Sequence, residues 1–275
     1  MKKFFLSMIL ICLFVLSLFS LSAFGETVNC TNIAQGSTPV TISNPGVYCL
    51  KANKTVNGET SAVTINADNV TIDLNGFELK AGNPVPFAGI TADSRSNITI
   101  KNGIVNGFTW EAATYIVDDA NPGAGKNTIV ENLKVINGEI RVDTDNSIIR
   151  NNQIMDLNVT DRKIGIVCYG ANSTFVVNND ISNTGSTGIH INKGHGVTVE
   201  GNRITNTPPV FGGSVGIDIR SGAYSAYVVN NRISNMETGI EFQGPGQYRD
   251  NMTQGCTTGI NPGVDAHDAG GNTSF

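Results

Sequence analysis

The sequence has few of the residues that helical or nucleic-acid-binding proteins rely on. Charged residues make up only 15% of it, Lys and Arg number 18 against 23 Asp and Glu, and Trp110 is the only tryptophan. Beyond Lys2 and Lys3 there is no basic run, which argues against nucleic acids and anionic membranes as partners. No long amphipathic helical pattern is present, whereas glycine and asparagine are abundant. The composition therefore predicts an all-β chain rich in turns.

The N-terminus has the pattern of a secretory signal. Lys2 and Lys3 precede an apolar run, and Ser22-Ala23-Phe24-Gly25 follows it as a small-x-small cleavage site. An uncleaved membrane anchor is the alternative, because the run is nearly long enough to span a bilayer. We expect a signal peptide over residues 1–25 and a secreted or periplasmic protein that has no membrane contact after cleavage. The mature chain keeps 16 basic and 23 acidic side chains, a net charge of −7.

Four cysteines remain in the mature chain. Cys30 and Cys49 bracket a short segment, and a secreted context favours a disulfide bond between them. Closing a loop of that size stabilises the fold by about 3 kcal/mol, because it restricts the unfolded chain. Cys168 and Cys256 are expected to lie several coils apart, too far for a bond.

An internal repeat organises most of the chain. Gly-Ile recurs with spacings of 23, 28, 23 and 20 residues, in GIVCYG (165–170), GIHINKG (188–194), GIDIRSG (216–222), GIEFQGPG (239–246) and GINPG (259–263). In a second register an asparagine stands two places before an apolar residue, at Asn75, Asn102, Asn152, Asn179, Asn202 and Asn231, with Asn132 and Asn251 fitting less well. Each repeat reads as three short strands separated by turns, with no room for a helix.

Three short strands per repeat of about 23 residues predict one coil of a parallel β-helix, a solenoid fold. The asparagines are expected to stack in one turn and to bond along the stack. We expect an N-terminal cap over residues 26–54 and roughly eight or nine coils in a β-helix domain over residues 55–275. Strand alternation sends Ile189 and Ile191 inward and His190 and Asn192 outward.

Two stretches, GVYCLKANKTVNGETSAVTINADNVTIDLNGFEL (46–79) and SNITIKNGIVNGF (96–108), resemble secreted bacterial right-handed parallel β-helix proteins of the pectin-lyase-like superfamily. The resemblance covers nearly the whole mature chain. It implies that the strand after the third turn, which contains Gly-Ile here, carries a site. The superfamily includes polysaccharide lyases, hydrolases, epimerases and non-catalytic relatives, so the fold alone does not choose among them.

Aligning the Gly-Ile strands with GITAD (89–93), TYIVD (114–118) and EIRVD (139–143) predicts two outward columns whose neighbours are ~4.8 Å apart. The first contains Thr91, Ile116, Arg141, Val167, His190, Asp218, Glu241 and Asn261. The second contains Asp93, Asp118, Asp143, Tyr169, Asn192, Arg220 and Gln243.

The second column begins with an acid ladder of Asp93, Asp118 and Asp143. Stacked carboxylates repel one another, so such a ladder suits Ca²⁺ or a carboxylic acid paired with a carboxylate. The resemblance implies the calcium-assisted chemistry of pectate lyases, with Asp118 and Asp143 as catalytic candidates. The alternative is that each aspartate caps the turn behind it through its own backbone. No cofactor is required by the sequence.

The first column brings together His190, Asp218 and Glu241, with Arg220 next to them. A histidine beside a carboxylate can act as a general base that its neighbour orients. Arg220, like Arg141 near the ladder, can pair with a substrate carboxylate. The alternative is a solvated polar column in which opposite charges avoid repulsion between strands.

Long loops at 108–114, 155–163 and 207–214 are expected to wall a groove over these columns. Trp110 and Tyr115 belong to the first loop and Phe211 to the third, and exposed rings there, like Tyr169 in the second column, suit stacking on sugars. The alternative is that these rings pack the loops onto the barrel.

Known enzyme motifs are missing. Gly194-His195-Gly196 follows the strand, where polygalacturonases have their histidine motif before it, so His195 is expected in a turn. The pectate-lyase R-x-P and the epimerase D-P-H-E runs are absent. The sequence therefore favours recognition of an extracellular or cell-wall polysaccharide. The alternatives are a polysaccharide lyase or glycoside hydrolase acting on acidic polysaccharide, and a non-catalytic structural or adhesive envelope protein.

Overall fold

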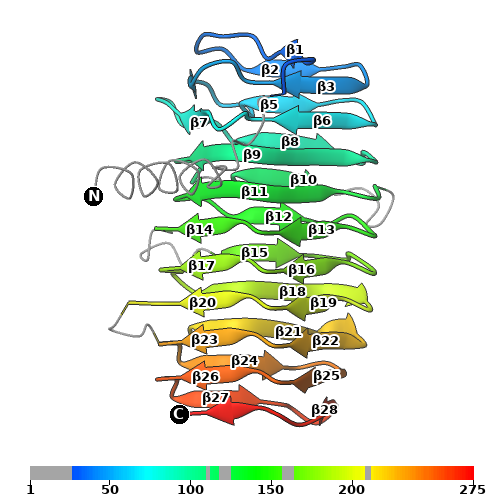
Figure 1. Cartoon of the computed structure of the whole chain (residues 1–275), viewed down its shortest axis with the longest axis vertical. Coiled ribbons are helices and arrows are strands. Elements are labelled where there is room, and N and C mark those ends of the chain that lie inside the picture. The colour runs from blue at the N-terminus through cyan, green and yellow to red at the C-terminus, as the bar shows by residue number, and fades with distance from the viewer. Residues whose placement is uncertain (1–26, 110–111, 118–124, 157–163, 208–211) are drawn as a thin grey trace, which may run out of the picture.

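The structure is a computed structural model that describes residues 27–109, 112–117, 125–156, 164–207 and 212–275. Over these residues the chain forms a stack of about nine right-handed coils, as the sequence predicts (Figure 1). Every strand pairs in parallel with its counterparts in the coils above and below. No helix among the described residues is long and apolar enough to cross a membrane.

One wall of the stack, here called the front sheet, contains the Gly-Ile strands. It runs in the order β2 (Val40–Ile42), β5 (Val63–Ile65), β8 (Ile90–Asp93), β10 (Thr114–Val117), β12 (Ile140–Val142), β15 (Ile164–Cys168), β18 (Thr187–His195), β21 (Val215–Tyr224), β24 (Thr238–Phe242) and β27 (Thr258–Asn261). These ten strands follow the chain order because each coil adds one of them.

The second wall consists of β3 (Gly46–Cys49), β6 (Val70–Asp73), the first half of β9 (Ile98–Asn106) and of β11 (Ile129–Ile136), β13 (Ile148–Arg150), β16 (Phe175–Val177), β19 (Thr198–Glu200), β22 (Ala226–Val229), β25 (Gly246–Arg249) and β28 (Ala266–Asp268). The third consists of β4 (Lys54–Val56), β7 (Glu78–Ala81), the second halves of β9 and β11, β14 (Gln153–Met155), β17 (Asp180–Ser182), β20 (Arg203–Thr205), β23 (Arg232–Ser234), β26 (Met252–Gln254) and β29 (Thr273–Ser274). Because β9 and β11 continue through the corner, these two walls form one hydrogen-bonded sheet.

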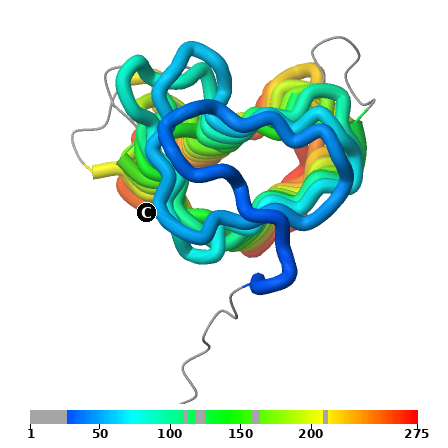
Figure 2. Tube along the Cα trace, turned by 90° about the horizontal axis from the view of Figure 1, so that it is seen from above, coloured from blue at the N-terminus to red at the C-terminus, as the bar shows by residue number. Residues whose placement is uncertain are grey.

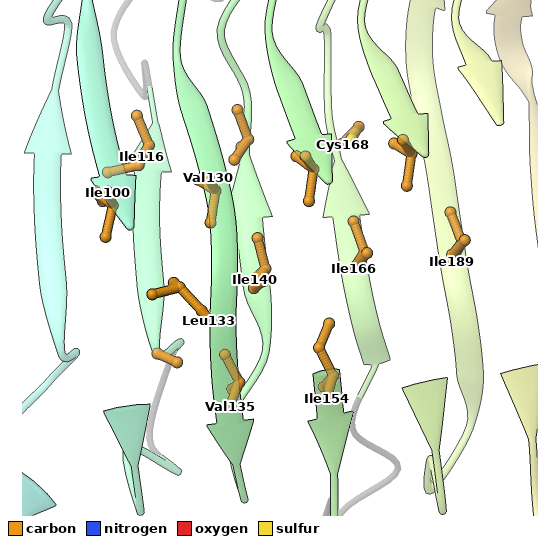
Figure 3. Close-up of a cluster of buried hydrophobic side chains, with 14 of the residues drawn as sticks. Ile100, Ile116, Val130, Leu133, Val135, Ile140, Ile154, Ile166, Cys168 and Ile189 are labelled. Carbon is orange, nitrogen blue, oxygen red and sulfur yellow. The ribbon is translucent and has the colours of Figure 1, made fainter. Parts of the chain in front are cut away.

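The core fills the space inside the coils with aliphatic side chains. Ile166, Ile189 and Cys168 are fully buried and point inward from the front sheet, as strand alternation predicts (Figure 3). Cys168 and Cys256 are both free thiols, so the prediction that they do not pair is confirmed. Burial, and then the charge of Asp143, raise the pKa of the Cys168 thiol, which is typical of an unreactive core cysteine.

The glycine of each Gly-Ile pair is required by close packing. A Cβ on Gly188 would lie 2.6 Å from the Gly216 carbonyl oxygen and 2.7 Å from Ile204 Cγ2, and Gly165 has the same surroundings one coil earlier. Only a residue without a side chain allows the front sheet to approach the third wall this closely. The repeat therefore records a packing requirement.

Buried asparagines form a continuous ladder at the corner between the second and third walls. The Oδ1 atom of Asn202 accepts hydrogen bonds from the backbone N–H and the Nδ2 of Asn179, at 2.9 and 3.0 Å. The same pair of bonds links Asn152 to Asn179, Asn202 to Asn231 and Asn231 to Asn251. The predicted stacking is confirmed for these five residues, and Asn251 is a full member.

The two upstream asparagines of the pattern lie one position away from the ladder. Asn102 and Asn132 register with Asn151, the residue before the ladder, and all three adopt a left-handed backbone with φ between 53° and 57°. Asn75 also has positive φ and bonds to the Leu50 carbonyl. Asn75 and Asn102 therefore lie outside the buried ladder, although Asn132 Nδ2 donates to Asn102 Oδ1 at 3.4 Å one position away from it. Asparagine suits both places, because it tolerates this conformation and also bonds to backbone groups.

The N-terminal end of the stack is covered by its own chain. The N-terminal segment crosses this end in Figure 2, and β1 (Thr31–Asn32) pairs with β3. Lys54 is 2% exposed, and its ammonium donates to the carbonyls of Ala34, Gly36 and Thr38, which holds the crossing loop. The predicted disulfide joins Cys30 to Cys49, with their Cα atoms 5.8 Å apart.

Replacement of one ladder asparagine is expected to destabilise the fold strongly. Asn202→Ala leaves the backbone N–H and the Nδ2 of Asn179 without the Asn202 oxygen, and it removes the Nδ2 donor that serves the Val176 carbonyl and Asn231 Oδ1. We expect the free energy of unfolding to fall by about 3 kcal/mol or more. The midpoint of urea unfolding measures this, and Gln247→Ala, at an exposed position, is the matched control with a change within about 0.5 kcal/mol. Equal midpoints for the two variants would contradict the ladder's role.

Candidate functional site

The outer surface of the front sheet presents one continuous column of side chains. Strand pairing places Thr64, Thr91, Tyr115, Arg141, Val167, His190, Asp218, Glu241 and Asn261 in register. The predicted column is confirmed except at β10, where Tyr115 takes the position that was assigned to Ile116. Ile116 pairs with Ala92 and Val142 and is fully buried. The alignment of TYIVD with GITAD sets Thr114 opposite Gly89, whereas strand pairing sets it opposite Ile90.

The same shift breaks the predicted acid ladder. Val117, 2% exposed, registers with Asp93, and Asp118 lies outside the described residues. Asp143 is buried and already bonded, since its Oδ2 accepts from Arg141 Nε at 2.9 Å and its Oδ1 from the Tyr169 backbone N–H at 3.0 Å. Of the residues that the structure describes, no three His, Cys, Asp or Glu lie close enough to hold a metal ion. Calcium binding therefore stays a prediction, and the described residues do not form a group of ligands for it.

The second predicted group does come together. His190 Nδ1 lies 3.0 Å from Asp218 Oδ2, and Arg220 Nε lies 2.8 Å from the same oxygen. The side chain of Asp218 is 1% exposed, that of His190 14% and that of Arg220 43%. Glu241 follows Asp218 in the column through the pairing of β21 with β24. An aspartate fixed below the surface thus holds a histidine and an arginine at the surface.

The geometry fixes which nitrogen of His190 is available. An ionised carboxylate only accepts hydrogen bonds, so the neutral imidazole donates from Nδ1 and keeps Nε2 as an acceptor. The second oxygen of Asp218, Oδ1, is buried and has no hydrogen-bond partner among the described residues. With Nδ1 held by Asp218 and Nε2 left as an acceptor, His190 has the orientation that a histidine needs for accepting a proton from a ligand.

Two aromatic side chains of the front sheet and its adjoining turns contact cationic groups. The Arg141 guanidinium lies 5.1 Å from the centroid of the Tyr115 ring, which meets the Phe87 ring edge-on at 5.5 Å. The Lys193 ammonium lies 4.8 Å from the centroid of the Tyr169 ring. Tyr115 lies on β10, as the alignment of TYIVD with the Gly-Ile strands predicts, and not in the predicted loop with Trp110.

Phe87 and Tyr115 stand at the edge of a depression in the front sheet, here called the aromatic hollow. It has a volume of about 380 Å³ and is lined by Glu59, Thr60, Ser61, Thr64, Asn66, Phe87, Thr91, Ala92, Asp93, Tyr115 and Val117. Sequence reasoning missed Glu59 and Phe87, because both belong to turns outside the repeat. The sequence signal close to them was the outward position of Thr64 and Thr91 on the neighbouring strands.

A larger hollow of about 590 Å³ lies at the asparagine corner, between Phe77, Asn102 and Leu133. Its carboxylate, Asp73, is 1% exposed and already accepts bonds from Thr27, Asn75 and Asn102. Since its buried charge is satisfied within the chain, we place the candidate site on the front sheet.

Other predicted positions differ or lie outside the described residues. His195 is the last residue of β18, where a turn was expected, and its ring stacks on Tyr224 at 5.1 Å. Trp110, Phe211 and residues 157–163 fall outside the described residues, so the wall that these loops were predicted to form stays a prediction.

Comparison with known families agrees with this architecture. Residues 126–275, more than half of the chain, match the model of the family described as the right-handed beta helix region. The chain belongs to this family. The comparison with curated proteins found no match.

Solved structures show the same fold at low sequence identity. The Dettilon tailspike protein aligns with a TM-score of 0.60 and 13% identity over 89% of this chain. This chain spans only 58% of the length of that tailspike. The polygalacturonase of Erwinia carotovora ssp. carotovora aligns with a TM-score of 0.55 and 13% identity, covering 88% of this chain and 84% of the enzyme. These likenesses place the chain in the pectin-lyase-like fold.

The tautomer of His190 provides a direct test of the site geometry. We expect at least about a tenfold preference for the proton on Nδ1 in the neutral ring, because hydrogen bonds to charged groups contribute ~1.5–3 kcal/mol. Long-range ¹H–¹⁵N NMR spectra of the imidazoles measure this. Asp218→Ala should remove the preference and leave the exposed His267 unchanged. A proton on Nε2 in the parent protein would contradict the arrangement.

Proposed function

We propose that the protein recognises an extracellular polysaccharide on the outer face of the front sheet. The observation that carries the proposal is the aromatic hollow at one end of a continuous column of side chains that are polar except at Val167. A flat ring with a polar rim stacks on the apolar face of a sugar, while hydroxyl, amide and charged groups bond to its hydroxyls.

The length of the column supports a polymer as the ligand. From Thr64 to Glu241 the column crosses seven coil steps, which is about 34 Å at ~4.8 Å per step. A surface this long and straight contacts several sugar units at once. Because its side chains project from paired strands, little ordering is needed when the ligand binds, and that favours affinity.

The fold and the disulfide support the cellular context. One protein with this fold is a polygalacturonase, so a stack of this kind is able to hold a polysaccharide chain. The Cys30–Cys49 bond is typical of oxidising compartments, which agrees with the signal sequence predicted over residues 1–25. We infer a secreted or periplasmic protein.

Removal of the Tyr115 ring should weaken binding of the polysaccharide. Tyr115→Ala deletes a stacking surface and the support of Arg141, and we expect retention by a polysaccharide to fall about tenfold. Affinity gel electrophoresis against a panel of soluble polysaccharides measures the retention.

Tyr227→Ala is the matched control, because Tyr227 is 43% exposed on the second wall, away from the column. It should leave retention unchanged. The proposal fails if no polysaccharide retards the parent protein, or if Tyr227→Ala weakens retention as much as Tyr115→Ala does.

A second candidate function is cleavage of the bound polysaccharide by a lyase or a glycoside hydrolase. The specific observation in its favour is the contact between His190 and the buried Asp218, which leaves Nε2 to accept or donate a proton. Asp218 would be a positioning residue in this case, and Glu241, one coil further on, a second proton-transfer group.

If the protein is an enzyme, His190→Ala should lower the rate of product formation by about 10²–10⁴-fold with little effect on retention of the polymer. New reducing or unsaturated chain ends, counted over time on a retained polysaccharide, measure the rate. His195→Ala is the control, since His195 lies beside Tyr224 outside the column. Absence of new chain ends with the parent protein would leave recognition as the function.

A further inference from the structure

The charges around the aromatic hollow select the kind of sugar that enters it. Among the described residues that line the hollow, two carry a charge, Glu59 and Asp93, and both are acidic. Both are exposed at the surface. The remaining polar side-chain groups are the hydroxyls of threonine, serine and Tyr115 and the amide of Asn66. No lysine or arginine is part of this lining.

Arg141, which lies over the ring of Tyr115, is already paired with a buried carboxylate. Arg141 contacts Asp143 Oδ2 through Nε at 2.9 Å and through a terminal nitrogen at 2.8 Å, and Asp143 is only 3% exposed. The guanidinium also covers the ring of Tyr115. Withdrawing it toward a ligand would leave a buried carboxylate without its counter-charge, which costs several kcal/mol.

The second arginine of the face is held in the same way. Arg220 bonds to Asp218, which is 1% exposed, and its terminal nitrogen donates to Gln243 at 3.3 Å. Each arginine is thus paired with a buried aspartate two residues away in the sequence. Because both arginines are paired in this way, neither of them is available to bind an anionic ligand.

We propose that the aromatic hollow binds an uncharged sugar unit and disfavours uronates, which deepens the proposed recognition of a polysaccharide and rests on it. A neutral ring stacks against Phe87 and Tyr115 and donates its hydroxyl hydrogens to Glu59, Asp93 and Asn66. A uronate in the same place brings its carboxylate toward the like charges of Glu59 and Asp93. No lysine or arginine among the described residues lines the hollow to pair with that carboxylate. Specificity of this kind arises from repulsion of the wrong ligand as well as attraction of the right one.

The experiment compares neutral and uronate-containing oligosaccharides on one glycan array. The best neutral ligand and oligogalacturonate are then titrated by calorimetry with the purified protein at moderate salt. We expect binding of neutral glycans, and binding of oligogalacturonate at least about tenfold weaker. Preference for the uronate, with or without added Ca²⁺, would overturn the inference while leaving polysaccharide recognition intact.

Two sets of variants locate the effect. Phe87→Ala should weaken the neutral ligand about tenfold, whereas Phe175→Ala, a phenylalanine 46% exposed on the second wall, should not. The double variant Glu59→Gln with Asp93→Asn changes only exposed carboxylates, so its folding is not at risk. It should improve the binding of oligogalacturonate relative to the neutral ligand about tenfold, because the two amides keep acceptor oxygens but carry no charge that repels a carboxylate.

The outcomes separate this inference from the proposed function. Neutral-glycan binding that Phe87→Ala leaves intact, or unchanged discrimination in the double variant, refutes the hollow as the selective site but keeps recognition. Silence of the whole array, with the thermal unfolding of the protein intact, refutes both.

Discussion

The in-register stacking of coils is the constraint on which the rest of this structure depends. Each coil is too thin to bury a core alone, and its backbone groups find their partners only in the coils above and below. A residue type that solves a problem in one coil must therefore solve it again at the same position in the next. The glycine column beside Ile204 and the ladder through Asn202 are both results of this repetition.

The same stacking creates the chemistry of the front sheet. Side chains in one column are only one strand spacing apart. Like charges in neighbouring strands therefore repel one another, and unlike charges pair. Asp143 and Asp218 are buried, and each is paired with an arginine two residues away in the sequence. His190 then receives a fixed orientation from Asp218 in the next coil along the chain. The face that results is rigid and polar and carries few uncommitted charges, and these properties suit a long ligand rich in hydroxyl groups.

Sequence reasoning reached most of the fold, because the Gly-Ile and asparagine patterns recur with the period of the coil. Both patterns predict the correct register from Gly165 to Asn251, where each coil contains Gly-Ile and the asparagine at corresponding positions. The same reasoning failed by one residue at β10 and at Asn102, where the repeat lacks Gly-Ile or has an asparagine at the neighbouring position. A shift of one place reverses inside and outside on a strand. Ile116 and Tyr115 consequently exchanged roles, and the acid ladder lost its middle member.

The sequence by itself determined the solenoid, the Cys30–Cys49 pair and the outward column that contains His190, Asp218 and Glu241. These features follow from periodicity, spacing and alternation, all of which are local. Only the tertiary structure decided that Arg141 and Arg220 are tied to buried aspartates and that Phe87 meets Tyr115 over a hollow. Phe87 lies in a turn outside the repeat, so no period predicts its neighbour. Its contact with Tyr115 exists because two coils of unequal length are held one above the other by the backbone ladder.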